Sequence, residues 1–133
     1  MGLLSFLFGK NAFSLGSGRR NVSTQTRQRI ELDWKQMDVM LRGSSPSQLK
    51  QALLIADKSL DNALRDLVEG ENMGQRMKNA KDLFDWGLYD KLWKAHKMRN
   101  SMVHEAGFDP TTGMIIAAVE NLRQGLYILG IRL

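Results

Sequence analysis

Apolar residues recur every three or four positions along most of this chain, and that spacing predicts α-helices rather than β-strands. No stretch alternates apolar and polar residues with a period of two, and no internal repeat is present. Helices are expected over residues 26–42, 46–69, 73–84, 88 to about 104–106, and 110–129. The expected fold class is therefore all-α: an antiparallel bundle of four long helices plus one short helix, the third.

Several helix ends carry capping signals. Ser45 before Pro46 predicts an N-cap followed by proline in the first turn, and Asp109 before Pro110 predicts the same start for the last helix. Gly70 is expected to stop the second helix.

Each long helix carries one apolar stripe, and we expect these stripes to face a shared core. The expected core residues are Ile30, Trp34, Met37, Leu41, Leu49, Leu53, Ala56, Leu60, Leu64, Leu67, Leu88, Leu92, Ala95, Met102, Ala106, Ile115, Val119, Leu122, Leu126 and Leu129. Gly125 is expected to allow close contact between two helices.

Arg99 interrupts the apolar stripe of the fourth helix. A guanidinium on a buried face costs several kcal/mol unless it finds a partner. Beside it, His96, Asn100 and His104 follow one another at intervals of four residues and form a polar row along the helix. A break of this kind in the apolar pattern is typical of a functional or strained site.

Two carboxylates and a group of basic residues complete the candidate site. Asp57 and Asp61 lie one turn apart beside the apolar stripe of the second helix, and they are the expected partners of Arg99. Lys94 and Lys97 precede Arg99, and no acidic residue lies between positions 91 and 104. We therefore expect a local basic patch on the helix that carries the arginine.

Composition narrows the function classes. The chain has 133 residues, which suits one domain with a substantial core, and it lacks cysteine, which excludes disulfides, cysteine-ligated zinc and thiol nucleophiles. We expect neither a metal nor a cofactor. The net charge of +5 lies in residues 1–29, whereas the remaining 104 residues carry 14 basic and 14 acidic side chains. The excess of basic residues therefore does not by itself indicate a nucleic-acid-binding domain.

Residues 1–25 are expected to form a flexible apolar and basic segment outside the core. Its apolar octet, residues 1–8, could instead contact an anionic membrane surface, although it is too short to anchor the chain alone. Phe6 stands where a myristoylation signal needs Ser or Thr, and the segment lacks the features of a secretory signal. No apolar run approaches the roughly 20 residues that span a bilayer, so a cytoplasmic location is expected.

The segment from Arg99 and Asn100 to His104 resembles the signature of the HEPN family of small helical-bundle domains, an arginine and a histidine separated by four residues. Further segments resemble small bacterial HEPN-like proteins: Trp34, residues 56–61, residues 73–77 and residues 92–96. The resemblance covers residues 29–129 and implies a HEPN-like helical domain over residues 26–133.

The resemblance implies a metal-independent endoribonuclease that acts as a homodimer, of the toxin or defence type, with an antitoxin or other protein as a further partner. His104 would transfer a proton to or from the RNA, and Arg99 would clamp the scissile phosphate. Asn100 would orient the phosphate or His104, while Lys94 and Lys97 would follow the RNA backbone.

The spacing along the helix adds His96 as a second acid/base or phosphate-binding group. Two other interpretations stay open. If Arg99 is a structural residue paired with Asp57 or Asp61, the chain is a non-catalytic HEPN-like module that binds nucleotide, RNA or a protein partner. If residues 1–8 contact a membrane, it is a peripheral interaction protein.

Overall fold

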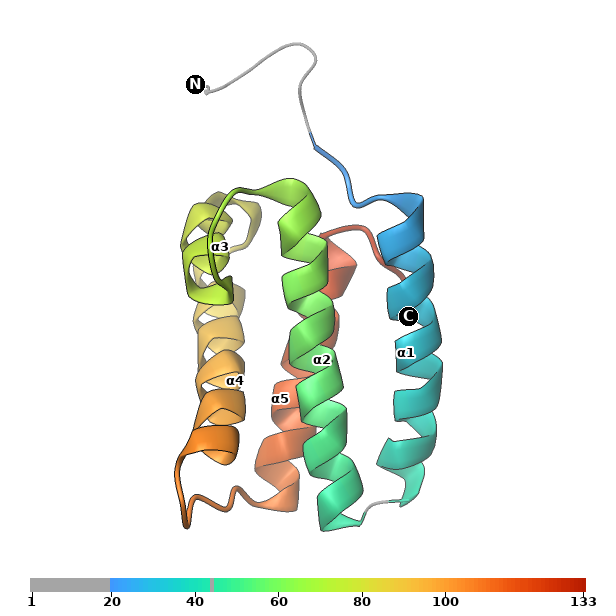
Figure 1. Ribbon diagram of the computed structural model, residues 1–133, viewed down its shortest axis with the longest axis vertical. Helices are drawn as coiled ribbons and strands as arrows, with labels where there is room; N and C mark the ends of the chain where they lie inside the picture. Colours follow the sequence, from blue (N-terminus) through green and yellow to red (C-terminus); the bar gives the residue numbers. More distant parts are fainter. Residues whose placement is uncertain (1–19, 44) are drawn as a thin grey trace.

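The computed structural model describes residues 20–43 and 45–133. In these ranges the chain is helical and without strands, so the predicted all-α class is confirmed. The elements are α1 (Thr24–Gly43), α2 (Pro46–Leu67), α3 (Met73–Asn79), the 3-10 helix η2 (Lys81–Leu83), α4 (Trp86–His104) and α5 (Thr112–Ile128). The four long helices lie side by side along the long axis, and the chain reverses direction from one to the next (Figure 1).

Side-chain caps explain where three of the helices begin. Ser45 caps α2 by accepting a hydrogen bond from the backbone N–H of Gln48, and Pro46 follows in the first turn, which confirms that prediction. Asn72 caps α3 and Asp85 caps α4 in the same way. The cap at Asp85 places Trp86 in the first turn of α4 and so sets the start of the helix that carries the candidate site.

The predicted start of the last helix was wrong by two residues. Thr111 caps α5 by accepting a hydrogen bond from the N–H of Met114, 3.1 Å away. The carboxylate of Asp109 instead forms an ion pair with Lys50 across a distance of 2.9 Å. Because Asp and Thr both suit a cap, a tertiary contact to α2 decided which of the two was used.

Two other helix ends also differ from the prediction. The chain leaves α2 at Leu67, before Gly70, whose positive φ of 153° and close approach to α3 belong to the connecting loop. The expected helix 73–84 is divided into α3 and η2. Ala106 lies beyond the end of α4 and is exposed, so its predicted place in the core was also wrong.

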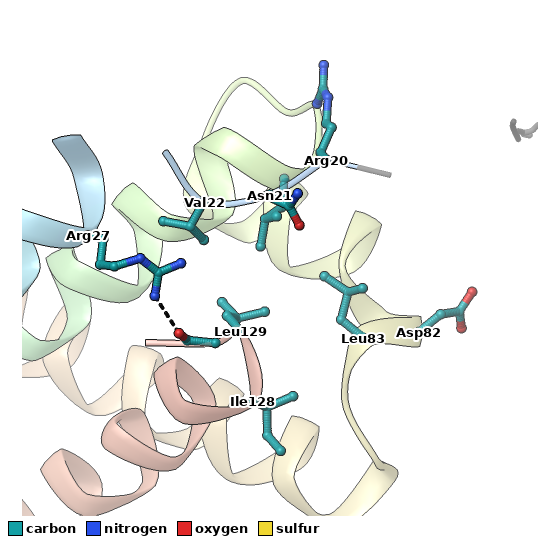
Figure 2. A pocket seen from close by; sticks show the side chains of 10 residues that line it. Arg20, Asn21, Val22, Arg27, Asp82, Leu83, Ile128 and Leu129 are labelled. Atoms are coloured by element: carbon teal, nitrogen blue, oxygen red, sulfur yellow. Dashed lines mark hydrogen bonds between the residues drawn. The ribbon is translucent and has the colours of Figure 1, made fainter. Parts of the chain in front are cut away.

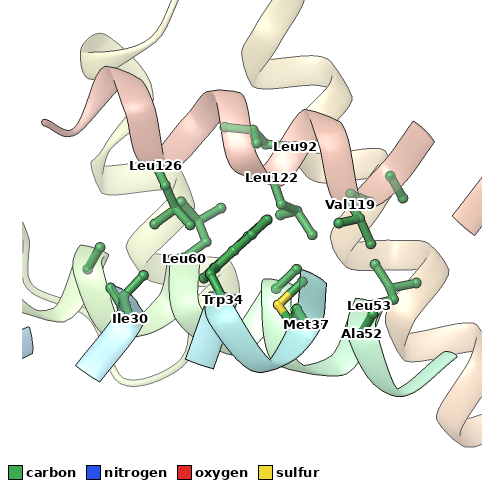
Figure 3. Close-up of a cluster of buried hydrophobic side chains, with 14 of the residues drawn as sticks. Ile30, Trp34, Met37, Ala52, Leu53, Leu60, Leu92, Val119, Leu122 and Leu126 are labelled. Carbon is green, nitrogen blue, oxygen red and sulfur yellow. The ribbon is translucent and has the colours of Figure 1, made fainter. Parts of the chain in front are cut away.

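The core lies between α2 and the other helices. α2 packs against α1, α3, α4 and α5, and α5 also packs against α4. In Figure 3, Trp34 extends from α1 toward Leu60 of α2 and Leu122 of α5. Most of the predicted core residues are fully buried; Leu41, Leu67, Leu88, Met102 and Leu129 are partly buried and pack against the core.

Residues before position 26, the predicted start of the domain, already contact the helical bundle. Val22 is buried in the core, and Arg20 forms an ion pair with Glu69. The octet of residues 1–8, with its predicted membrane contact, lies outside the described residues. Within the described ranges, no helix has the length and apolar character needed to cross a membrane.

Candidate functional site

A buried carboxylate and an imidazole lie at the centre of the candidate site. Asp57 lies on α2 and is 3 % exposed, and its side chain points toward α4. The His96 Nδ1 atom lies 2.9 Å from one carboxylate oxygen of Asp57 and 3.2 Å from the other. A buried carboxylate needs such a partner, because an unpaired charge away from water is costly.

Arg99 and Asn100 extend this contact into a network of four residues, which we call the α2/α4 cluster: Asp57, His96, Arg99 and Asn100. The Arg99 Nε atom lies 3.8 Å from Asp57 Oδ2, and its Nη1 atom donates a hydrogen bond of 3.1 Å to Asn100 Oδ1. The amide nitrogen of Asn100 then faces His96 Nε2 across 3.4 Å. This arrangement favours the tautomer that donates from Nδ1 and leaves Nε2 as the acceptor.

The cluster borders an open pocket between α2, α3 and α4. The pocket has a volume of about 410 Å³ and is lined by Gln51, Leu54, Ile55, Asp57, Lys58, Asp61, Met73, His96 and Arg99. Arg99 keeps 34 % of its side chain exposed, whereas Asp57 keeps only 4 %. The guanidinium is therefore held in place by the chain and still reachable by a ligand.

Asp61 has a different partner from the predicted one. Its carboxylate accepts hydrogen bonds from Nε and Nη2 of Arg76, at 2.7 and 3.0 Å, so the expected contact of Asp61 with Arg99 was wrong. Arg76 also donates to the carbonyl oxygen of Gly70, and it is 7 % exposed. The sequence offered one signal for this pair: Arg76 stands among the apolar residues Met73 and Met77, where a charge requires a buried partner.

His104 does not join the cluster. It is exposed, it does not line the pocket, and its side chain makes no hydrogen bond or ion pair with any residue that the structure describes. The geometry of one helix explains this, because five residues turn the direction of a side chain by about 140°. Arg99 and His104 therefore point toward different sides of α4.

The two lysines of the predicted phosphate-binding group lie on the outer surface of α4. Lys94 forms an ion pair of 2.9 Å with Asp90, one turn earlier, and Lys97 lies over the indole ring of Trp93 at 5.9 Å from its centroid. Both lysines are exposed.

A second pocket, of about 460 Å³, lies near the start of α1 and the end of α5 (Figure 2). Arg20, Leu83 and Ile128 are among its lining residues, and Arg27 donates a hydrogen bond to the carbonyl oxygen of Gly130 beside it. None of the residues predicted to act on RNA lines this pocket.

No family model matches the chain, and neither a curated protein nor a solved structure matches it. The resemblance to HEPN domains therefore rests on the sequence segments described above.

Proposed function

We propose that this chain is a HEPN-like antiparallel helical bundle that cleaves RNA without a metal and acts as a homodimer. The observation that carries the proposal is the α2/α4 cluster: a partly exposed guanidinium beside an imidazole that a buried carboxylate orients. Arg99 would bind the scissile phosphate through its planar fork of N–H donors. An imidazole would transfer the proton between the ribose 2′-hydroxyl and the leaving oxygen.

The positions of the side chains along α4 support the proposal of two copies. His96 and His104 are eight residues apart, which separates them by about 12 Å along the axis of α4. His104 also leaves α4 on a different side from Arg99 and does not line the pocket, so Arg99 and His104 of one chain are not placed to act on the same phosphate. A second copy could bring its own His104 to the phosphate that Arg99 of the first copy binds.

The roles of the two histidines differ in this proposal. His96 has a fixed ring orientation, because Asp57 accepts from its Nδ1 and leaves Nε2 toward Asn100. His104 has no such support from the described residues of its own chain. We therefore assign phosphate binding to Arg99, general acid/base chemistry to His104, and a second acid/base or phosphate-binding role to His96.

One observation favours the alternative, a non-catalytic module that binds RNA, nucleotide or a protein partner. Arg99 already has an ion pair with Asp57 inside the chain, so its position is explained without a reaction. In that case the cluster would bind a phosphate group or brace the two helices, and His104 would have no role in it.

RNA cleavage in EDTA distinguishes the two functions. We expect the wild type to cleave a single-stranded RNA, and Arg99→Ala and His104→Ala each to lower the rate by at least about 100-fold. His96→Gln tests the role assigned to His96, and Lys35→Ala, on an exposed side chain of α1 that does not line this pocket, is the control that keeps its activity.

Unfolding measurements accompany each variant. The Arg99–Asp57 distance is long and Arg99 is partly exposed, so Arg99→Ala should lower the unfolding free energy by about 1 kcal/mol or less. A folded wild-type dimer that cleaves no RNA in a broad panel would contradict the nuclease and favour the binding module.

A further inference from the structure

The outer side of α4 carries a row of five residues that the pocket does not include. Trp86, Trp93, Lys97, Asn100 and His104 follow one another at intervals of seven, four, three and four residues. At 3.6 residues per turn, their side chains leave the helix within about 60° of one another. We call this row the α4 stripe; it runs the full length of the helix, about 27 Å.

The α4 stripe is open to solvent at both ends and at its centre. Trp86 is 70 % exposed, the highest value of any large apolar side chain in the described residues, and Lys97 and His104 are exposed as well. Trp93 is half-buried, and its ring edge lies against α3, where a Cβ on Gly74 would be 3.7 Å from it. An indole with so much free surface at the start of a helix contributes little to the core and is available to a ligand.

The chemistry of the α4 stripe matches a single-stranded nucleic acid. Exposed indoles stack on unpaired bases of any type, and lysines beside them attract the phosphates. Lys97 lies over the ring of Trp93, so a cation and an aromatic surface are in contact at the centre of the row. Asp90 lies within the span of the row, but its carboxylate is paired with Lys94 at 2.9 Å, and no acidic residue follows it before position 105. A length of about 27 Å suits a strand on the order of four nucleotides, the lower end of single-strand sites.

A second copy of the chain fits the same surface less well. Interface cores are depleted of lysine, whereas Lys97 stands at the middle of this row and Lys94 lies beside it. The two apolar members, Trp86 and Trp93, are seven residues apart, and the ring of Tyr89, which lies near both indoles, is itself buried and adds little exposed apolar surface. Charge complementarity therefore favours RNA as the occupant.

We propose that the α4 stripe binds a single strand of RNA, with an unpaired base stacked on Trp86 and phosphates on Lys97 and His104. Asn100 connects this surface to the α2/α4 cluster, since its amide contacts both Arg99 and His96. The guanidinium of Arg99 leaves α4 on a different side, so Asn100 is the member of the α4 stripe that lies next to the group proposed to bind the scissile phosphate. This link to cleavage rests on the proposed function, whereas the binding itself does not.

Binding is measured with a fluorescent 2′-O-methyl oligonucleotide of ten residues, which has no free 2′-hydroxyl and cannot be cleaved by 2′-hydroxyl attack. We expect Trp86→Ala to weaken binding about tenfold and Trp86→Phe to retain most of it, because base stacking needs an aromatic ring. Lys97→Ala should lower the slope of log affinity against log salt by about one. Leu32→Ala, which removes a side chain that is 61 % exposed on α1, is the matched control and should bind like the wild type.

Three results would overturn this proposal: no binding of the oligonucleotide by the wild type, unchanged binding by Trp86→Ala, or equally tight binding of a duplex. Loss of a homodimer in Trp86→Ala with unchanged oligonucleotide affinity would assign the α4 stripe to a second copy and would likewise overturn it. Binding that depends on Trp86 without cleavage of unmodified RNA supports the stripe and contradicts only the nuclease. Cleavage of unmodified RNA, together with oligonucleotide binding that does not depend on Trp86, would contradict only the proposed binding of RNA by the α4 stripe.

Discussion

Asp57 and Asp61 lie one turn apart on α2, yet their carboxylates have different partners. Asp57 contacts His96 and Arg99 at an open pocket, whereas Asp61 holds the buried guanidinium of Arg76 through two hydrogen bonds. Arg99 keeps 34 % of its side chain exposed and stays within reach of a ligand, whereas Arg76 keeps only 9 %. At the scale of single residues, the exposure of the arginine distinguishes the candidate functional contact from the structural one.

The Asp61–Arg76 pair should be among the most important ion pairs for stability. Asp61→Ala leaves a guanidinium with 9 % of its side chain exposed and no carboxylate, so we expect the unfolding free energy to fall by about 3 kcal/mol. Asp90→Ala removes the exposed pair with Lys94 and should cost about 0.5 kcal/mol or less. Urea unfolding of both variants tests this, and equal losses would show that Arg76 finds another partner.

At the scale of elements, Gly125 of α5 lies at a close contact between helices. A Cβ placed there would lie 2.8 Å from Leu92 Cδ2 and 3.6 Å from Leu60 Cδ1, so the glycine allows α5 to approach both α4 and α2. The close contact predicted for Gly125 is confirmed. The α4–α5 contact thus helps to position the helix that carries Arg99 and the α4 stripe.

Gly125→Ala should therefore destabilise the protein by about 1–2 kcal/mol through overpacking, despite the better helix propensity of alanine. Gly113→Ala is the matched control on the same helix, because a Cβ at that position would have no neighbour within 4 Å. That variant should be neutral or more stable by up to about 0.5 kcal/mol. Thermal unfolding compares the two, and a stabilised Gly125→Ala would show that Leu92 moves aside freely.

At the scale of the whole molecule, the start of α1 is joined to the end of α2 by one carboxylate. Asp66 accepts a hydrogen bond of 2.9 Å from the backbone N–H of Ser23, the residue that precedes α1. Burial raises the pKa of Asp66, but this bond and the hydroxyls of Thr26 and Ser23 outweigh it and lower the pKa below its ordinary value. The ionised form of Asp66 is thus favoured by folding.

This shift gives a pH dependence with a definite sign. Because the pKa is lower in the folded chain, Asp66 stabilises the fold above the ordinary carboxyl pKa of about 4 and ceases to do so as the pH falls through the folded value. Asp66→Asn should be less stable than the wild type at pH 6, and the difference should shrink in acid. Asp82→Asn, on an exposed side chain, serves as control. A difference that is constant from pH 6 to pH 2 would contradict this role.

The local pattern of the chain determined the helices, most of the core and the start of α2. Helix periodicity needs only neighbouring residues, so Ile30, Trp34 and Met37 were correctly placed inside. The pattern also gave Asp57 and Asp61 as candidate partners of Arg99, because a charge on an apolar face requires one, and Asp57 is the one that contacts it. It placed Arg99, Asn100 and His96 in one region of α4, which the structure confirms through their hydrogen bonds.

Only the tertiary structure decided which of several equivalent groups made each contact. Asp109 and Thr111 both suit a helix cap, and the nearness of Lys50 determined that Thr111 is the one used. Asp57 and Asp61 share a face of α2, and the position of α3 decided which of them met Arg76. Sequence spacing defines the direction of a side chain along its own helix, but its partner depends on the packing of distant helices. The separation of His104 from the pocket that Arg99 borders has a local cause instead, since the five-residue spacing of the two side chains turns them toward different sides of α4.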